Sequence, residues 1–287
     1  ARGEFKKAYD IILKDNPLLS VCSRVCNHPC ETKCRAGQGG EPIAIRALKR
    51  FASDYGGRYA KKEARKSPVG PKVAIIGSGP AGLMAAYQLA RKGHAPTIFD
   101  ALPVIGGMLA VGIPEYRLPR KELRQDIERI IKAGVEIKTN QKFGRDFSLE
   151  DLNKQGYKAV YIAIGAHKSV KSAIANEEAR GVIPAMEFLT KVHLGEKINP
   201  VRDPTLKGNI HNKSLGVEDF SNGVNIGKRV GVIGGGNSAV DAARVALRLP
   251  GVEKVTIIYR RTRSEMPAYE EEITLSLIHI SEPTRPY

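Results

Sequence analysis

One segment constrains this chain more than any other, the run VAIIGSGPAGLMAAYQLARKGHAPTIFD at residues 73–100. A β-branched strand leads into G-x-G-x-x-G at Gly77, Gly79 and Gly82, and a helix and a second strand follow. Gly77 permits a tight turn, Gly79 lets a pyrophosphate approach the backbone, and Gly82 lets the helix pack closely on the strand. The pattern predicts a dinucleotide-binding βαβ unit, with the loop residues Pro80 and Ala81 and the helix N-terminus at the phosphates.

Two features after this loop bear on which dinucleotide binds. The second strand ends at Asp100, whose carboxylate is placed to accept hydrogen bonds from a ribose diol. The segment IGGMLAVGIPEYRLP that follows is rich in glycine and contains Pro114, which suggests a loop pressed against something flat and bulky. A plain NAD site has no such requirement.

The strand–loop–helix pattern returns in RVGVIGGGNSAVDAARVAL, where Gly234, Gly236 and Ala239 give G-x-G-x-x-A. The next strand, KVTIIY, ends at Arg260 and Arg261, where an NAD site would place an acid. A carboxylate there would repel a 2′-phosphate, whereas an arginine can pair with it. NADPH is therefore favoured over NADH. The alternative is a solvated cationic turn made of these two arginines and Arg263.

The chain as a whole is expected to be α/β. Residues 1–57 look helical, with short helices at 5–13 and 43–55, and the Gly-, Pro- and charge-rich residues 58–71 look like a linker. Strands and helices alternate from residue 72, which is the signature of a parallel sheet. The pattern fades between residues 168 and 227, which remain unassigned, and restarts at Lys228.

All four cysteines lie in CSRVCNHPCETKC, at Cys22, Cys26, Cys30 and Cys34. One continuous helix would place them near one face, but Pro29 argues against such a helix. Zinc sites usually use two C-x-x-C pairs separated by a longer loop. Four thiolates in so short a span fit a 4Fe–4S cluster better than zinc or buried thiols. Clustered cysteines without a signal sequence suggest a reducing cytoplasm.

Part of the net charge of +16 lies between Arg46 and Lys72, a stretch that contains nine Lys or Arg residues and only two acidic residues. A solvated helix and linker surface explains this best, because no nucleic-acid motif accompanies the charge. A third interpretation, between a nucleic-acid surface and a merely solvated one, is a docking surface for an acidic partner or for anionic cofactors. Nucleic acid is therefore not expected as a partner. A membrane is not expected either, because no apolar run is long enough to span a bilayer.

Taken in order, these motifs resemble the glutamate synthase small-subunit family of flavoproteins. The resemblance rests on VCSRVCNHPCETKC, EPIAIRALKRFASD, GSGPAG, GGMLAVGIPEYRLP, YIAIGAHKSV, VIGGGNSAVDAARVALR and YRRTRSEMPA, and it runs from about Asp15 to Ile273. It implies an FAD domain at 72–227 with its connecting segment, and a partial NAD(P)H domain at 228–273.

The resemblance also implies roles for individual residues. FAD would be held at its pyrophosphate and ribose by the first glycine loop and Asp100. The flavin would be lined by Gly107, Met108, Gly112, Ile113 and Pro114, with Ala163, Ile164 and Gly165 as the strand end crossing beneath FAD. NADPH would be cradled by Gly234, Gly236, Asn237, Ser238 and Ala239, with Arg260 and Arg261 on its 2′-phosphate.

In such proteins a hydride passes from nicotinamide to flavin, and electrons then leave singly through iron–sulfur clusters to a partner subunit. The partner would be the glutamate synthase large subunit or another redox enzyme, such as a hydrogenase, a formate dehydrogenase or a transhydrogenase-type complex. No acid–base residue is assigned. A thioredoxin-reductase-like function is set aside because no cysteine follows Cys34. A catalytically inert nucleotide- or metal-binding fragment is the alternative.

Three departures from the family pattern accompany these expectations. The upstream cysteine block typical of the family is missing here, which leaves the number of clusters open. The NADPH domain stops after two strands and one helix, so the chain is expected to be a C-terminally truncated fragment. The last residues, LSLIHISEPTRPY, depart from the family pattern and suggest that 274–287 are a non-native tail. A genuine short strand followed by a tail is the alternative.

Overall fold

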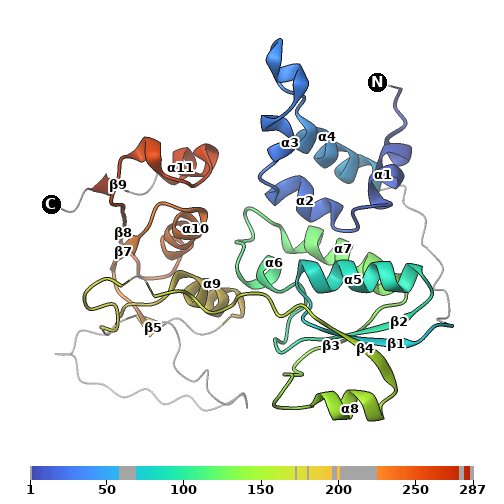
Figure 1. Cartoon of the computed structure of the whole chain (residues 1–287). Coiled ribbons are helices and arrows are strands. Elements are labelled where there is room, and N and C mark those ends of the chain that lie inside the picture. The colour runs from blue at the N-terminus through green and yellow to red at the C-terminus, as the bar shows by residue number, and fades with distance from the viewer. Residues whose placement is uncertain are drawn as a thin grey trace. The chain divides into compact units, whose positions relative to one another are not determined.

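The strand–loop–helix unit expected around the first glycine loop lies at the centre of the first of two structural units, Ala1–Gly165 and Ala166–Tyr287 (Figure 1). The computed structural model describes residues 2–57, 69–171, 173–179, 181–195, 199–200, 225–277 and 281–284. The greater part of the expected linker, 58–68, lies outside these residues, as do 201–224 and the tail residues 278–280 and 285–287.

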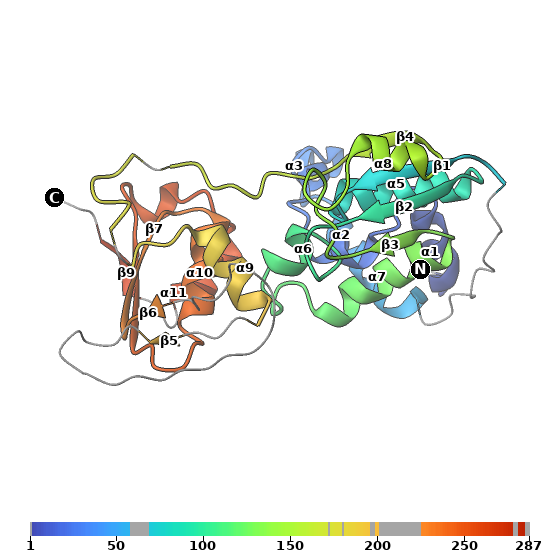
Figure 2. The ribbon, with the colours of Figure 1, turned by 90° about the horizontal axis from the view of Figure 1, so that it is seen from below.

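The first unit contains a four-stranded parallel sheet. Its strands are β1 (Lys72–Ile76), β2 (Ala95–Phe99), β3 (Glu136–Lys138) and β4 (Tyr157–Ile162), in the order β3-β2-β1-β4. Figure 2 shows the four strands side by side in this order. Helices α5 (Pro80–Arg91) and α7 (Arg120–Lys132) cover one face and α8 (Leu149–Lys154) covers the other (Figure 1). This confirms the strands and helices that the sequence predicts for residues 72–165, a stretch called here the first nucleotide-binding domain.

Alternate residues of the central strand β1 enter two different cores. Val73 and Ile75 belong to the core beneath α5 and α7, whereas Ala74 and Ile76 pack with Phe99 on the α8 side. A strand turns successive side chains to opposite faces, so a strand covered on both faces must be apolar throughout. The unbroken apolar run of β1 therefore follows from its central position.

Residues 2–57 form the N-terminal helical domain. Its elements are α1 (Phe5–Leu13), α2 (Leu19–Val25), α3 (Pro29–Thr32), η1 (Arg35–Gln38), α4 (Ile45–Phe51) and the π-helical turn η2 (Ala52–Gly56). The expected helix at 5–13 is confirmed, and the one expected at 43–55 is observed as α4 followed by η2. Pro29 opens the new helix α3 after a left-handed residue, His28 (φ 39°), so no continuous helix runs through the cysteines.

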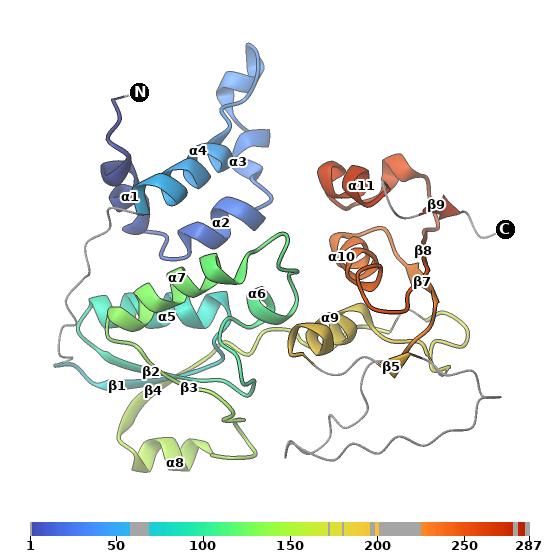
Figure 3. The ribbon, with the colours of Figure 1, turned by 180° about the vertical axis from the view of Figure 1, so that it is seen from behind.

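The N-terminal helical domain packs on the first nucleotide-binding domain. Helices α1, α2 and α4 lie beyond α5 and α7, on the side away from the sheet (Figure 3). Leu18 and Val21 are buried in the same apolar cluster as Ile75, Leu83 and Ile127. The two domains therefore share one apolar core.

The second unit contains the second glycine loop. Strands β7 (Arg229–Ile233), β8 (Lys254–Ile258) and β9 (Ser281–Thr284) form a parallel sheet in that order, with α10 (Asn237–Ala246) between β7 and β8. The remaining elements are the short strands β5 (Asn199–Pro200) and β6 (Asn225–Ile226), and the helices α9 (Ala185–His193), η4 (Arg263–Glu265) and α11 (Glu270–Leu277).

Helix α9 lies in the stretch that the sequence left unassigned. It begins directly after Pro184, and its Phe188 and Leu189 are buried against the same cluster as Val240 of α10. Its nine residues are too few to give a clear helical period among loop-forming neighbours. Burial against α10 therefore decides its structure.

The unit boundary at Gly165 differs from the expected domain limits. Residues 166–227 are expected from the sequence to belong to the FAD domain, whereas the described part of this stretch groups with the second glycine loop. Within the expected tail, α11 continues to Leu277 and β9 pairs with β8. The domain limits and the origin of the tail stay predictions. None of the helices in the described ranges combines the length and the apolar character that a bilayer crossing requires.

Replacement of Leu189 by alanine should destabilise the second unit. Leu189 is 1% exposed, and a buried Leu→Ala change costs about 2–5 kcal/mol because it leaves a cavity. The matched control is Leu275→Ala on α11, where the side chain is 48% exposed and the expected change lies within about 0.5 kcal/mol. Urea unfolding measures both, and equal losses in the two variants would contradict the assignment of α9.

Candidate functional site

The first glycine loop has the geometry that its sequence predicts. Gly77 has φ 109°, and a Cβ there would lie 2.4 Å from the carbonyl oxygen of Ala163. A Cβ on Gly82 would lie 1.9 Å from the carbonyl oxygen of Gly77, so only glycine lets α5 begin this close to β1. A Cβ on Gly79, in contrast, would meet nothing within 4 Å. The space over Gly79 fits a pyrophosphate that approaches the backbone at the start of α5.

Asp100 lies at the end of β2 beside this loop and is buried. Its Oδ2 accepts hydrogen bonds from the Ser78 backbone N–H (2.7 Å) and hydroxyl (2.5 Å), and its Oδ1 accepts one from the Leu102 N–H (2.8 Å). A carboxylate has about four acceptor positions, so roughly one stays free for a ribose hydroxyl. Asp100 therefore shapes the loop as well as offering an acceptor to a ligand.

Ser78 is a site residue that the sequence analysis missed. Its hydroxyl donates to Asp100 and accepts from the Gly106 N–H (3.1 Å), so it joins the glycine loop to the segment that follows β2. The side chain is completely buried. Position 78 is a variable position of the glycine fingerprint, which is why the motif gave no signal for it.

The segment expected to line the flavin meets the first loop. It contains the short helix α6 (Met108–Val111), and Gly107 approaches so closely that a Cβ there would lie 2.9 Å from the Gly79 Cα. Arg120, at the start of α7, donates to the carbonyl oxygens of Leu109 and Ile113, both at 2.9 Å. Burial lowers the pKa of Arg120. Arg120 therefore fixes this segment, and the sequence analysis did not single it out.

The strand end at 163–165 closes the same site. The Ala163 N–H donates to the Ile76 carbonyl oxygen at 2.8 Å, and Gly165 has φ 66°. The chain thus leaves the sheet next to Gly77, at the carboxyl ends of β1 and β4. Ligands of open parallel sheets bind at this edge. The structure therefore brings together the glycine loop, Asp100, the segment 107–114 and the strand end 163–165.

The second glycine loop has a similar shape. Gly234 has φ 136°, and a Cβ there would lie 3.2 Å from the Ala239 side chain. A Cβ on Gly236 would meet nothing within 4 Å, and α10 starts at the next residue. The side-chain oxygen of Asn237 accepts from the Tyr269 N–H (3.0 Å), so Asn237 supports the loop from within the protein. Ser238 is exposed. This arrangement fits a second dinucleotide.

Arg260 and Arg261 follow β8 and are exposed. The nearby acid Glu265 forms a capping box, in which its Oε2 accepts from the Thr262 N–H (2.9 Å) and hydroxyl (2.7 Å). Within the described ranges, neither arginine forms an ion pair with an acid of this protein. Both guanidinium groups are therefore available to an anionic group such as a 2′-phosphate.

The four cysteines are spread over two helices and their ends. Cys22 lies within α2, Cys26 follows it, Cys30 lies in α3, and Cys34 precedes η1. They form no disulfide. The His28 N–H donates to the Cys26 sulfur at 3.4 Å, which makes His28 a neighbour of the thiol through its backbone.

The surroundings of the thiols differ. Hydrogen bonds from the backbone N–H groups of Ile43 and Ala36 lower the pKa of the Cys34 thiol, whereas burial raises the pKa of Cys22. Backbone N–H groups directed at sulfur stabilise thiolate and tune iron–sulfur clusters. The all-sulfur donor set and these N–H···S contacts fit an iron–sulfur cluster.

Ligation of a single metal ion would need a tighter arrangement. Zinc holds its ligand atoms about 2.0–2.3 Å from one ion. Among the residues that the structure describes, no three His, Cys, Asp or Glu side chains gather around one such point. In a 4Fe–4S cluster each thiolate binds a different iron, which spaces the sulfurs farther apart. The ligand set of the four cysteines stays a prediction.

Comparison with protein families gives two matches. Residues 71–281 match the pyridine nucleotide-disulphide oxidoreductase family. Residues 1–61 match the domain described as dihydropyrimidine dehydrogenase domain II, 4Fe-4S cluster. These matches confirm the expected cofactor set of FAD, NAD(P)H and a 4Fe–4S cluster. They also confirm the fold class.

Several characterised proteins are similar over nearly the whole chain. The beta subunit of NADP(+)-dependent formate dehydrogenase from Moorella thermoacetica is 42% identical over 296 residues, covering 94% of this chain and 38% of that protein. The beta subunit of NADPH-Fe(3+) oxidoreductase from Geobacter sulfurreducens is 43% identical over 271 residues, covering 92% and 36%. The glutamate synthase (NADPH) small chain of Escherichia coli is 34% identical over 280 residues, covering 94% and 55%.

Among solved structures, the oxidoreductase FprA of Mycobacterium tuberculosis in complex with NADPH matches with a TM-score of 0.55 and 22% identity, covering 71% of this chain and 46% of FprA. This likeness concerns the fold alone. The relatives confirm the resemblance to proteins of the glutamate synthase small-chain type, although the chain spans only 36–38% of the two beta subunits. By its match over residues 71–281, the chain belongs to the pyridine nucleotide-disulphide oxidoreductase family.

Proposed function

We propose that this chain is the electron-entry part of a larger redox protein or complex. It would take reducing equivalents from NADPH at the second glycine loop, hold FAD at the first, and deliver electrons to an iron–sulfur cluster at the four cysteines. When bound, the flavin supplies the conversion between two-electron and one-electron chemistry. The protein's own residues bind and orient the cofactors, and none is assigned as an acid or base.

One observation carries this proposal above the others. The cysteine-bearing helix α2 shares an apolar core with the strands and helices that form the first glycine loop, through Leu18 and Val21. Cys22 and Val25 pack against the same cluster. The cysteine segment is thus built onto the dinucleotide site instead of being a separate module. This arrangement favours electron transfer between the two over independent metal and nucleotide binding.

The nucleotide preference is inferred from the end of β8. Arg260 and Arg261 are exposed there, and Glu265 is held in its own capping box. A 2′-phosphate would find two cations at this position, whereas NADH would gain nothing from them. We therefore assign NADPH as the electron donor.

The electron acceptor is proposed to be a catalytic redox subunit. Two of the relatives are named as beta subunits, one of a formate dehydrogenase and one of an Fe(3+) oxidoreductase. Their identities of 42% and 43% exceed the 34% of the glutamate synthase small chain, which favours a partner of the former kinds over the glutamate synthase large subunit. Neighbouring genes check this, because a glutamate synthase large-subunit gene beside this one would contradict the preference.

The anaerobic absorption spectrum tests the proposed function directly. The purified protein should show a flavin band above broad iron–sulfur absorbance, and NADPH should bleach both because the electrons reach both centres. A bound flavin that NADPH does not reduce would instead support a nucleotide-binding protein without turnover. Zinc by metal analysis together with no flavin would contradict the proposal.

Adding a methyl group at the middle glycine of each loop should show which nucleotide binds at which loop. Gly79→Ala and Gly236→Ala meet no protein atom within 4 Å, so both variants should fold normally. Each methyl group would occupy the space of a pyrophosphate, which weakens binding about five- to 150-fold. Gly79→Ala should lower FAD affinity and Gly236→Ala should lower NADPH affinity, as titration measures. Each variant is the control for the other, and loss of the same nucleotide in both would refute the assignment.

The double variant Arg260→Ala/Arg261→Ala should bind NADPH about ten- to 150-fold more weakly because it loses charged hydrogen bonds to the 2′-phosphate. Its affinity for NADH should stay within about twofold, since NADH lacks that phosphate. Arg263→Ala is the matched control on the same turn and should change neither affinity. Unchanged NADPH binding in the double variant would support the solvated-turn alternative.

A further inference from the structure

Helix α2 is capped by a residue of a distant helix. Its first turn receives no side-chain cap from its own segment. Instead, the Val21 N–H donates to Oδ2 of Asp126, on α7, at 3.1 Å. The first amides of a helix have no partner inside the helix, and a carboxylate is a favourable acceptor for them. Asp126 is completely buried, so this contact joins the N-terminal helical domain to the first nucleotide-binding domain from the inside.

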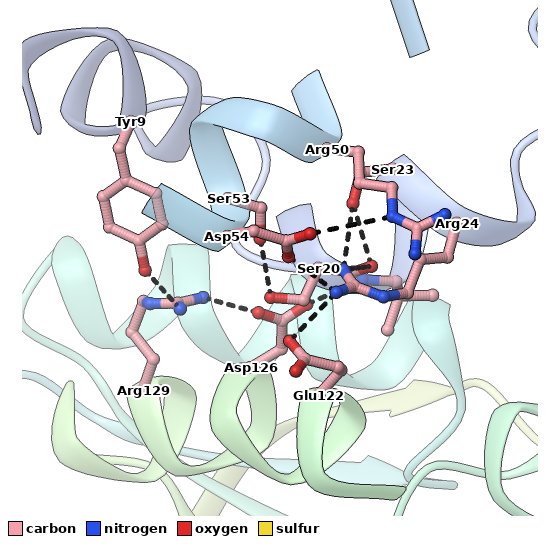
Figure 4. A network of polar contacts seen from close by, with 11 residues as sticks. Tyr9, Ser20, Ser23, Arg24, Arg50, Ser53, Asp54, Glu122, Asp126 and Arg129 are labelled. Atoms are coloured by element: carbon pink, nitrogen blue, oxygen red, sulfur yellow. Dashed lines mark hydrogen bonds and ion pairs between the residues drawn. The ribbon is translucent and has the colours of Figure 1, made fainter. Parts of the chain in front are cut away.

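Arg129 holds Asp126 and extends the contact. Its guanidinium donates to Asp126 Oδ1 (2.9 Å) and to the Tyr9 hydroxyl (2.5 Å) (Figure 4). It also donates to the Pro17 carbonyl oxygen (2.8 Å). Burial raises the pKa of Asp126, and the neighbouring guanidinium opposes that shift. One arginine of α7 thus reaches α1, the chain that enters α2, and the carboxylate that caps α2.

A cavity of about 950 Å³, open to solvent, lies beside these contacts at the boundary between the N-terminal helical domain and the first nucleotide-binding domain. It is lined by side chains of α1, α2, η2, α5 and α7. Arg24 pairs with Asp54 of its own domain at 2.6 Å and reaches across the boundary to Glu122 of α7 at 3.5 Å. Apolar packing of Leu18 and Val21 holds α2 on the first nucleotide-binding domain, and polar contacts with α7 add direction to it. Asp126 and Arg129 are the residues of α7 that act on the N-terminal end of α2.

The position of α2 matters for the cysteines. Cys22 directly follows the capped residue Val21, and Cys26 is the first residue after the helix. A shift of α2 would move both thiols relative to the first glycine loop. In the proposed step the reduced flavin gives up one electron and the cluster accepts it. The rate of this electron transfer falls steeply as the distance between the two centres grows.

We propose that Asp126, held by Arg129, is a positioning residue for electron transfer: it fixes α2, and with it Cys22 and Cys26, on the first nucleotide-binding domain. The effect on electron transfer rests on the proposed function. The docking of α2 on the first nucleotide-binding domain can be measured whether or not that function is correct. Asp126 touches neither cofactor in this proposal and acts through the helix that it caps.

Hydrogen–deuterium exchange of the cofactor-free protein gives the first readout. In Asp126→Ala the amides of α2 should exchange about fivefold faster, which is the effect of losing a helix cap. Those of α10 should not change. Asp126→Asn keeps an acceptor for the Val21 N–H and should restore most of the protection. The matched control is Glu128→Ala on the same helix, an exposed acid that pairs with Lys132 at 3.6 Å. Unchanged α2 exchange in Asp126→Ala would overturn the proposal.

The second readout is the rate at which the cluster is reduced after the flavin. In Asp126→Ala protein with full flavin and iron content, NADPH should reduce the flavin at the wild-type rate. The paramagnetic signal of the reduced cluster should then appear more slowly than in the wild type, because a shifted α2 moves Cys22 and Cys26 relative to the first glycine loop. Equal cluster rates in the variant and the wild type would overturn the proposal.

Two measures keep this test decisive. If Asp126→Ala fails to retain both cofactors, Arg129→Lys replaces it, because it keeps the positive charge but cannot contact Asp126, Pro17 and Tyr9 together. Cluster reduction should then also be slower than in the wild type, and an unchanged rate refutes the inference. If NADPH fails to reduce wild-type flavin, the proposed function fails. Photoreduction of the flavin then still measures electron passage to the cluster in wild type and variant.

Discussion

The closeness of helix α5 to strand β1 is the constraint on which the first unit depends. A Cβ at position 82 would lie 1.9 Å from the Gly77 carbonyl oxygen, so the helix can start there only because the residue is glycine. The same approach leaves the backbone at Gly79 open, and it places Ser78 where it bonds both Asp100 and Gly106. The open space at Gly79, the position of Asp100 and the approach of Gly107, to which we assign phosphate, ribose and flavin, therefore all depend on this packing contact.

A second dependence joins the cysteines to that site. Leu18 and Val21 of the N-terminal helical domain complete a core formed largely by the first nucleotide-binding domain. Apolar burial has no preferred direction, so it holds α2 against its neighbour without fixing its rotation or its slide. The hydrogen bonds that Asp126 and Arg129 form with α2 and with Pro17, which precedes it, have a fixed direction, and they set the rotation and slide of α2. Docking and alignment of the cysteine segment thus have separate physical origins.

Much of the candidate site could be predicted from local sequence. Glycine fingerprints, an acid at a strand end and clustered cysteines each depend on residues close together in the chain, so their chemistry can be predicted without a structure. Ser78, Arg120 and Asp126 were missed for the opposite reason. Each acts through a partner that is distant in sequence or through a backbone group, as in the contact of Asp126 with Val21. Helix α9 was missed because tertiary burial, and not periodicity, decides it.

The sequence by itself determined that two dinucleotide loops and a cysteine segment exist, because a missing Cβ, a positive φ and a thiol are properties of single residues. It also indicated a break at Pro29, since proline cannot continue the preceding helix. Only the tertiary structure decided that the cysteine helix belongs to the core of the first nucleotide-binding domain and is capped from α7. Such contacts depend on which surfaces remain unburied once the sheet and its helices have formed, and that is a property of the assembled chain.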